Sequence, residues 1–177
     1  MKSSSSPSHH ASARRSHNWR DYLPLLVLLG VTALAATAHQ HGSAAATGMA
    51  AWMHNFMGLF LVIFAMLKLF NLSAFADGFQ MYDLLAKPFR PYAFLYPFIE
   101  LALGLGYLAG WRPALLYPVT VVVMVFGALG VMRSLMAGLD LQCACMGNIL
   151  KVPLSTVSLS EDLGMAAMAA AMWLLPT

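Results

Sequence analysis

Charged residues are scarce in this sequence, and their scarcity sets the class of protein. Only 10% of the 177 residues are Asp, Glu, Lys or Arg, whereas 60% are hydrophobic. A soluble globular domain has about 25% charged and 45–50% apolar residues. The net charge of +3 comes mainly from the first 20 residues, so the chain carries no extended basic surface for nucleic acid. The composition excludes an ordinary water-soluble domain and a nucleic-acid partner.

Cysteine is also nearly absent, because Cys143 and Cys145 are the only two. Two thiols cannot build the disulfide framework that stabilises small secreted domains. The paired Cys/His spacing of a structural zinc site is missing as well. The two cysteines are therefore either a local functional site or two small buried residues.

The hydrophobic residues occur in long runs. A helix in water is apolar on one face, whereas a helix in lipid is apolar all round. The runs predict membrane helices at 23–38, 49–70, 94–109, 114–136 and about 161–175. The sequence thus predicts an all-α, integral membrane helical bundle whose main partner is the lipid bilayer.

The predicted organisation has three parts. Residues 1–21 form a polar, basic tail with no apolar run, which is typical of disorder. Residues 22–38 form an N-terminal transmembrane helix or an uncleaved signal anchor. A cleaved signal peptide is the alternative, since the stretch ends in an A-x-A pattern at 36–38. Residues 49–177 form a four-helix transmembrane domain.

Two longer connections, 71–93 and 137–159, are separated by two predicted spans and therefore share one face of the membrane. The first is expected to contain a short helix at the interface, and the second holds the cysteines. Ser158 and Glu161 have the spacing of a capping box, which predicts the start of the last helix. A site built from both connections is geometrically allowed.

The basic residues are divided unevenly between the two faces. With the N-terminus inside, nine of the ten Lys and Arg residues fall at the cytoplasmic face and only Arg112 lies outside. Cytoplasmic segments carry such an excess of basic residues. The bias predicts a multi-pass protein of the bacterial inner membrane with a cytoplasmic N-terminus.

Cys143 and Cys145 form a C-x-C pair with three possible interpretations. A disulfide between them would close a small, strained ring, and strained disulfides exchange readily. The same thiolates would suit a soft cation such as Cu(I) or Hg(II), with Met146 as a third ligand. Alternatively, they are small hydrophobic residues packed at a helix end. The spacing alone does not choose among redox, metal and packing roles.

Lys68 and Glu100 are ionisable groups inside apolar helices. Such groups are costly in lipid and are usually paired or functional. In antiparallel helices both lie at the face of the cysteines, so a buried ion pair is one expectation. The other is a catalytic role, with Glu100 as a proton acceptor and Lys68 as a cation that favours a thiolate. The same face also receives Tyr82, Asp83, Arg133, Asp140, Glu161 and Asp162, some of them as interfacial anchors.

The opposite face carries imidazole and thioether side chains. They are His39, His41 and His54, with Met49, Met53 and Met57. These groups would suit copper capture at an outer mouth, but a methionine stripe more often fills a core. Met165, Met168 and Met172 repeat the spacing on the last helix. Glycines within the helices, Gly104 and Gly127 among them, predict close helix approach.

From about residue 52 to its end, the chain resembles the MauE/DoxX-type redox-associated membrane proteins, in particular the methylamine-utilisation MauE family. The resemblance rests on a four-span core, on the segment YPFIELALG at 96–104, and on the C-x-C-x-G element at 143–147. Segments 81–84 and 152–157 are similar to a branch found beside, or fused to, heavy-metal-associated domains.

The resemblance implies a four-helix MauE/DoxX-like core. The extra N-terminal hydrophobic helix and the tail before it depart from the family's pattern. The resemblance also implies thiol-disulfide redox chemistry, or maturation of an exported partner, through Cys143 and Cys145, with a thioredoxin-like protein as another partner. The MauE family is tied to maturation of the disulfide-rich small subunit of methylamine dehydrogenase. Heavy-metal transport or handover of Cu(I) or Hg(II) is the alternative function, and a structural membrane subunit without chemistry is the second. No cofactor other than such a soft metal ion is expected.

The expected orientation conflicts with oxidation of an exported partner. That reaction requires thiols that are reachable from outside, whereas the charge bias places them at the cytoplasmic end, where thiols normally stay reduced. A re-entrant loop, outward passage of reducing equivalents or metal binding would each resolve the conflict.

Overall fold

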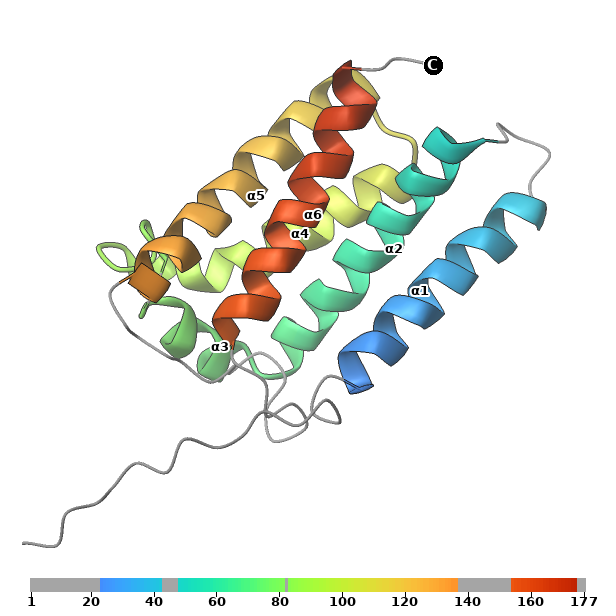
Figure 1. Ribbon diagram of the computed structural model, residues 1–177. Coiled ribbons are helices and arrows are strands. Elements are labelled where there is room, and N and C mark those ends of the chain that lie inside the picture. The colour runs from blue at the N-terminus through green and yellow to red at the C-terminus, as the bar shows by residue number, and fades with distance from the viewer. Residues whose placement is uncertain (1–22, 43–47, 82, 137–153, 175–177) are drawn as a thin grey trace, which may run out of the picture.

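The computed structural model describes residues 23–42, 48–81, 83–136 and 154–174 (Figure 1). These residues form six α-helices. They are α1 (Leu23–Gly42), α2 (Met49–Phe70), α3 (Leu72–Phe79), α4 (Arg90–Leu108), α5 (Pro113–Met136) and α6 (Leu154–Leu174). No strand occurs among the described residues, which confirms the all-α prediction.

Most helix bounds follow the hydrophobic runs. The helix predicted over 49–70 has those bounds in the structure, and α3 is the short helix expected in the first connection. Helix α4 begins at Arg90, four residues before the predicted 94, with Pro91 in its first turn. Proline fits there because the first N–H groups of a helix have no intrahelical acceptor. Helix α1 continues past residue 38 to Gly42.

The predicted start of the last helix is wrong. Helix α6 begins at Leu154 rather than 161, so Ser158 and Glu161 lie inside it and do not form a capping box. Residues three apart are neighbours on one helix face wherever they occur, and the same spacing therefore arises within a helix.

Three of the described helices, α1, α2 and α5, are long and apolar enough to cross a membrane. Helix α4 has 19 residues and α6 has 21, which correspond to about the 30 Å thickness of a bilayer core, but they are less apolar. The protein is a helical membrane protein with several spans. Helices α4 and α6 pack along α2 and α5 respectively (Figure 1).

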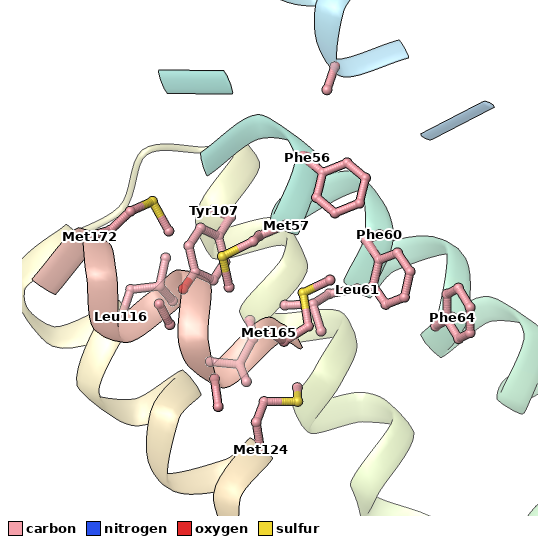
Figure 2. Packing of buried hydrophobic residues seen from close by; sticks show 14 residues of the cluster. Phe56, Met57, Phe60, Leu61, Phe64, Tyr107, Leu116, Met124, Met165 and Met172 are labelled. Carbon is pink, nitrogen blue, oxygen red and sulfur yellow. The ribbon is translucent and has the colours of Figure 1, made fainter. Parts of the chain in front are cut away.

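The bundle core is filled by aliphatic, aromatic and thioether side chains from five helices, α1, α2, α4, α5 and α6 (Figure 2). Met57 of α2 is fully buried, and Met165 and Met172 of α6 are nearly so. Met49, by contrast, is 73% exposed. The methionine stripes are therefore mainly packing residues rather than the lining of an outer mouth.

Helices α2 and α4 touch through glycine. A Cβ atom at Gly104 would lie 2.9 Å from the backbone nitrogen of Val62 and 3.0 Å from the carbonyl oxygen of Gly58. Only a residue without a side chain permits this separation, which confirms the close approach expected at Gly104. The contact fixes the register of two helices that carry the ionisable residues.

Helix α1 lies against α2 at the edge of the bundle (Figure 1). The indole Nε1–H of Trp52 donates to Thr37 Oγ1 at 3.0 Å, and Gln40 Nε2 donates to the Gly48 carbonyl oxygen at 3.0 Å. Much of the rest of α1 is exposed. The extra hydrophobic helix is thus attached to the bundle through one neighbour.

The described helix ends that flank the two long connections lie at one end of the bundle, which we name the Lys68 end. The C-terminal ends of α2 and α5 meet the N-terminal ends of α4 and α6 there, beside α3 (Figure 1). Met136 and Leu154, which flank the cysteine-bearing segment, end their helices at this same end. The prediction that the two connections share a face is confirmed for their described parts.

Candidate functional site

Lys68 and Glu100 form a buried ion pair. The Lys68 ammonium donates to both carboxylate oxygens of Glu100. Lys68 is 8% exposed and Glu100 is 1% exposed. A charge removed from water is tolerated when it is both paired and hydrogen-bonded, and the pair therefore joins α2 to α4. The ion-pair expectation from the sequence is confirmed.

Aromatic rings complete the surroundings of the Lys68 ammonium. Its nitrogen lies 5.3 Å from the ring centroid of Tyr96 and 5.7 Å from that of Phe75. The ring of Phe79 packs at 4.6 Å from Tyr96 and 5.0 Å from Phe75, centroid to centroid. Ring faces attract a cation and exclude water. Helix α3 therefore supplies an apolar cover for a charged group.

Asp162 approaches the same place from α6. It is 6% exposed. A Cβ atom at Gly127 of α5 would lie 2.9 Å from Asp162 Oδ2 and 3.5 Å from the Tyr96 hydroxyl oxygen. The absent side chain of Gly127 is thus what makes room for the Asp162 carboxyl group beside Tyr96. The sequence placed Asp162 at the correct face but assigned it no role in the site.

A small cavity lies between these groups. Its lining residues are Lys68, Phe75, Phe79, Tyr96, Gly127, Ser158 and Asp162. Its volume of about 10 Å³ is room for about one water molecule. The polar lining comes from Lys68, Ser158 and Asp162, which belong to α2 and α6.

Asp83, between α3 and α4, adds a third buried carboxyl group at the Lys68 end. Its Oδ1 atom accepts hydrogen bonds from the backbone N–H groups of Leu85 at 2.9 Å and Ala86 at 2.8 Å. Its Oδ2 atom is buried without a hydrogen-bond partner in the described part of the chain. Burial raises the pKa of the Asp83 carboxyl group, and the backbone hydrogen bonds offset this only in part.

The cysteine predictions lie outside the described residues. Cys143, Cys145 and Met146 belong to the segment 137–153, so their redox and metal roles stay predictions. Within the described ranges, no group of three or more His, Cys, Asp or Glu side chains is arranged to hold a metal ion.

His54 holds helices together at the opposite end. Its Nε2 lies 2.6 Å from the carbonyl oxygen of Tyr107, and its Nδ1 lies 3.1 Å from the Tyr117 hydroxyl. A carbonyl oxygen only accepts, so Nε2 carries the hydrogen and Nδ1 accepts from Tyr117. Both ring nitrogens are occupied, which leaves none for the copper ligand considered from the sequence.

The fold and this cluster define a multi-pass helical membrane protein with a buried ionic site at one end of its bundle. The family model described as methylamine utilisation protein MauE matches residues 46–175. The chain belongs to the MauE family, which confirms the resemblance seen in the sequence. The matched region contains α2 to α6 and leaves out α1. No curated protein and no solved structure gives a significant match.

Proposed function

We propose that this MauE-family protein is a thiol-disulfide redox protein that acts in the maturation of an exported partner through Cys143 and Cys145. One observation carries the proposal. Met136 and Leu154, the described residues on either side of the cysteine-bearing segment, end their helices where the Lys68–Glu100 pair and Asp162 lie. We therefore expect the segment that carries the two cysteines to lie near charged groups able to tune a thiol.

The proposed reaction is an exchange of one disulfide for another. A thiolate of the partner attacks the Cys143–Cys145 disulfide and forms a mixed disulfide, and the second partner thiolate then resolves it. The partner loses two electrons and gains a disulfide, and the two cysteines become thiols that take up the partner's two protons. A thioredoxin-like protein in its disulfide form would accept the electrons and reoxidise the pair. During reoxidation, Lys68 is the cation that favours the attacking thiolate of the pair, and Glu100 is the acceptor of its proton.

Trapping the mixed disulfide tests this function. Cys145→Ser should leave the thioredoxin-like protein covalently attached through Cys143, or Cys143→Ser should do so through Cys145, because the remaining thiolate still attacks its disulfide and the second cysteine that would release it is missing. Adducts should appear on non-reducing gels and disappear with reductant. The double Cys→Ser variant is the matched control without adducts. Absence of an adduct from both single variants would contradict the redox function.

A metal-handling function is the second candidate, favoured by the presence of Met146 directly after Cys145. Two thiolates and a thioether are soft ligands suited to Cu(I) or Hg(II). Each single Cys→Ser substitution should then weaken metal binding by the purified protein, Met146→Leu should weaken it too, and no variant should trap a partner. If neither adducts nor metal binding occurs, a structural subunit without chemistry is the remaining candidate.

We infer that the Lys68 end and the N-terminus face the cytoplasm of a bacterial cell. Three described basic residues, Lys87, Arg90 and Arg133, are exposed at this end, whereas Arg112 follows α4 at the other. Helix α1 also begins near this end (Figure 1), and the basic tail precedes it. The distribution supports the positive-inside orientation.

A further inference from the structure

The charges around Lys68 do not balance. Glu100 binds the Lys68 ammonium through both oxygens and so neutralises it. Asp162 is a further carboxyl group at this place, and only 6% of its surface is exposed. It lies within electrostatic reach of Lys68, Glu100 and Asp83. A second carboxylate beside an already neutralised cation would be an uncompensated buried charge, which is strongly unfavourable. Protonation removes that charge.

The hydrogen bonding of Asp162 leads to the same conclusion. Among the described residues, no side chain or backbone group donates a hydrogen bond to its carboxyl oxygens, although it lines the water-sized cavity with Lys68 and Ser158. A buried carboxylate is normally stabilised by several donors. A protonated carboxyl group is neutral, and it carries a donor of its own that can point into the cavity.

We propose that Asp162 is a proton-binding site, whose carboxyl group holds a proton in the folded protein and exchanges it with water through the cavity beside Ser158. The site lies one turn beyond Ser158 in α6, close to the Lys68 end, and α3 covers its other side with Phe75 and Phe79. The proton therefore reaches water from one face of the membrane. The inference concerns proton binding alone, so it is tested separately from the thiol chemistry.

The groups that face Asp162 come from each neighbouring element of the described chain. Helix α2 contributes Lys68, helix α4 contributes Glu100 and Tyr96, and the segment after α3 contributes Asp83. Helix α3 contributes only the apolar rings, and α5 contributes Gly127. Lys68 is the cation among these groups, and Glu100 and Asp83 are carboxyl groups like Asp162 itself.

Infrared spectroscopy of the purified full-length protein in lipid tests the site. A protonated carboxyl group gives a carbonyl-stretch band distinct from that of a carboxylate. The wild-type protein should show this band at neutral pH and lose it at high pH. In D₂O the frequency of the band should fall, because deuterium replaces the hydrogen of the carboxyl group. Incorporation of ¹³C-labelled aspartate should shift the band, since this labels Asp162 and not Glu100. A neutral-pH spectrum without a labelled aspartate band would overturn the proposal without need of a variant.

Five variants assign the band. Asp162→Asn should abolish it, whereas Asp83→Asn and the surface variant Asp77→Asn should retain it. Gly127→Ala should change its frequency or the pH at which it is lost, because the added methyl group would press on Asp162 Oδ2 at 2.9 Å. Gly164→Ala, where an added Cβ meets nothing within 4 Å, is the matched control. Persistence of the band in Asp162→Asn would refute the assignment.

Discussion

Lys68 and Glu100 lie 32 positions apart in the sequence and form the buried ion pair that joins the end of α2 to the middle of α4. The Gly104 contact between the same helices sets their register, and the aromatic rings of α3 and α4 cover one side of the ammonium. Neither residue can be removed alone without leaving a charge unpaired. The pair is therefore an internal constraint on how α2 and α4 assemble.

A double-mutant cycle measures that constraint. Glu100→Gln and Lys68→Met should each destabilise the protein by about 3–5 kcal/mol, since each leaves one buried charge without its partner. The double variant should lose less than the sum of the two losses. The free energy of unfolding in detergent or lipid gives the coupling. Strictly additive losses would show that the two groups do not stabilise each other.

Gly104→Ala should weaken the α2–α4 contact. The added Cβ atom would lie 2.8 Å from Val62 Cγ2 and 2.9 Å from the Val62 backbone nitrogen, so the helices must separate, at an expected cost of about 1–3 kcal/mol. Thermal unfolding of the purified protein measures the loss. Gly164→Ala is the control within α6, because nothing lies within 4 Å of its added Cβ, and it should be neutral or slightly stabilising. Equal effects from both variants would contradict a close helix contact at Gly104.

Asp83 should make the protein less stable as pH rises. Its pKa in the folded protein is raised above the ordinary 3.8, chiefly by burial. The folded state therefore keeps a proton at pH values where the unfolded chain has lost it. Stability from this group is fully present below the ordinary pKa and is lost as pH rises through the raised one.

Substitution of Asp83 isolates this effect. Asp83→Asn retains an oxygen that accepts from the Leu85 and Ala86 N–H groups, and it should flatten the fall in stability above pH 4. Unfolding curves at a series of pH values compare it with the wild-type protein. Asp77→Asn, in the exposed ion pair with Arg90, should leave the pH dependence unchanged. If Asp83→Asn leaves it unchanged too, the buried carboxyl group does not bind the proton.

The proposed orientation predicts a pattern of cysteine labelling in intact cells. In a background with Cys143→Ser and Cys145→Ser, Arg112→Cys should react rapidly with a membrane-impermeant thiol reagent. Arg133→Cys should react only after permeabilisation, because it lies at the opposite end of the bundle. The native cysteines should follow Arg133→Cys. The reverse pattern would place the Lys68 end outside and remove the conflict with an exported partner.

Sequence analysis predicted best those features that follow from the cost of placing polar or charged groups in lipid. Helix α2 has the bounds of its hydrophobic run, because a span ends where apolar residues end. The pairing of Lys68 with Glu100 was predictable for a related reason, since a lone charge in hydrocarbon is costly and one partner was available at the same depth.

The parts that sequence analysis missed depend on contacts between distant segments. The S-x-x-E pattern at Ser158 suggested a helix start, whereas α6 had already begun at Leu154. A signal for Asp162 was nevertheless present, because it shares a helical face with the buried Met165, Ala166 and Ala169 at spacings of three, four and seven. The role of Gly127 was not predictable, since the group that needs its space comes from another helix.

In the proposed topology, the antiparallel contact between α1 and α2 determines on which side of the membrane a domain joined to this protein would lie. Since α1 begins at the Lys68 end, a domain attached ahead of Leu23 would be delivered to the same side of the membrane as the ionic cluster (Figure 1). A domain attached after Leu174 would emerge on the other side. Without α1, the MauE-family bundle would begin on that other side. In this topology the additional helix determines on which side of the membrane the N-terminal segment lies.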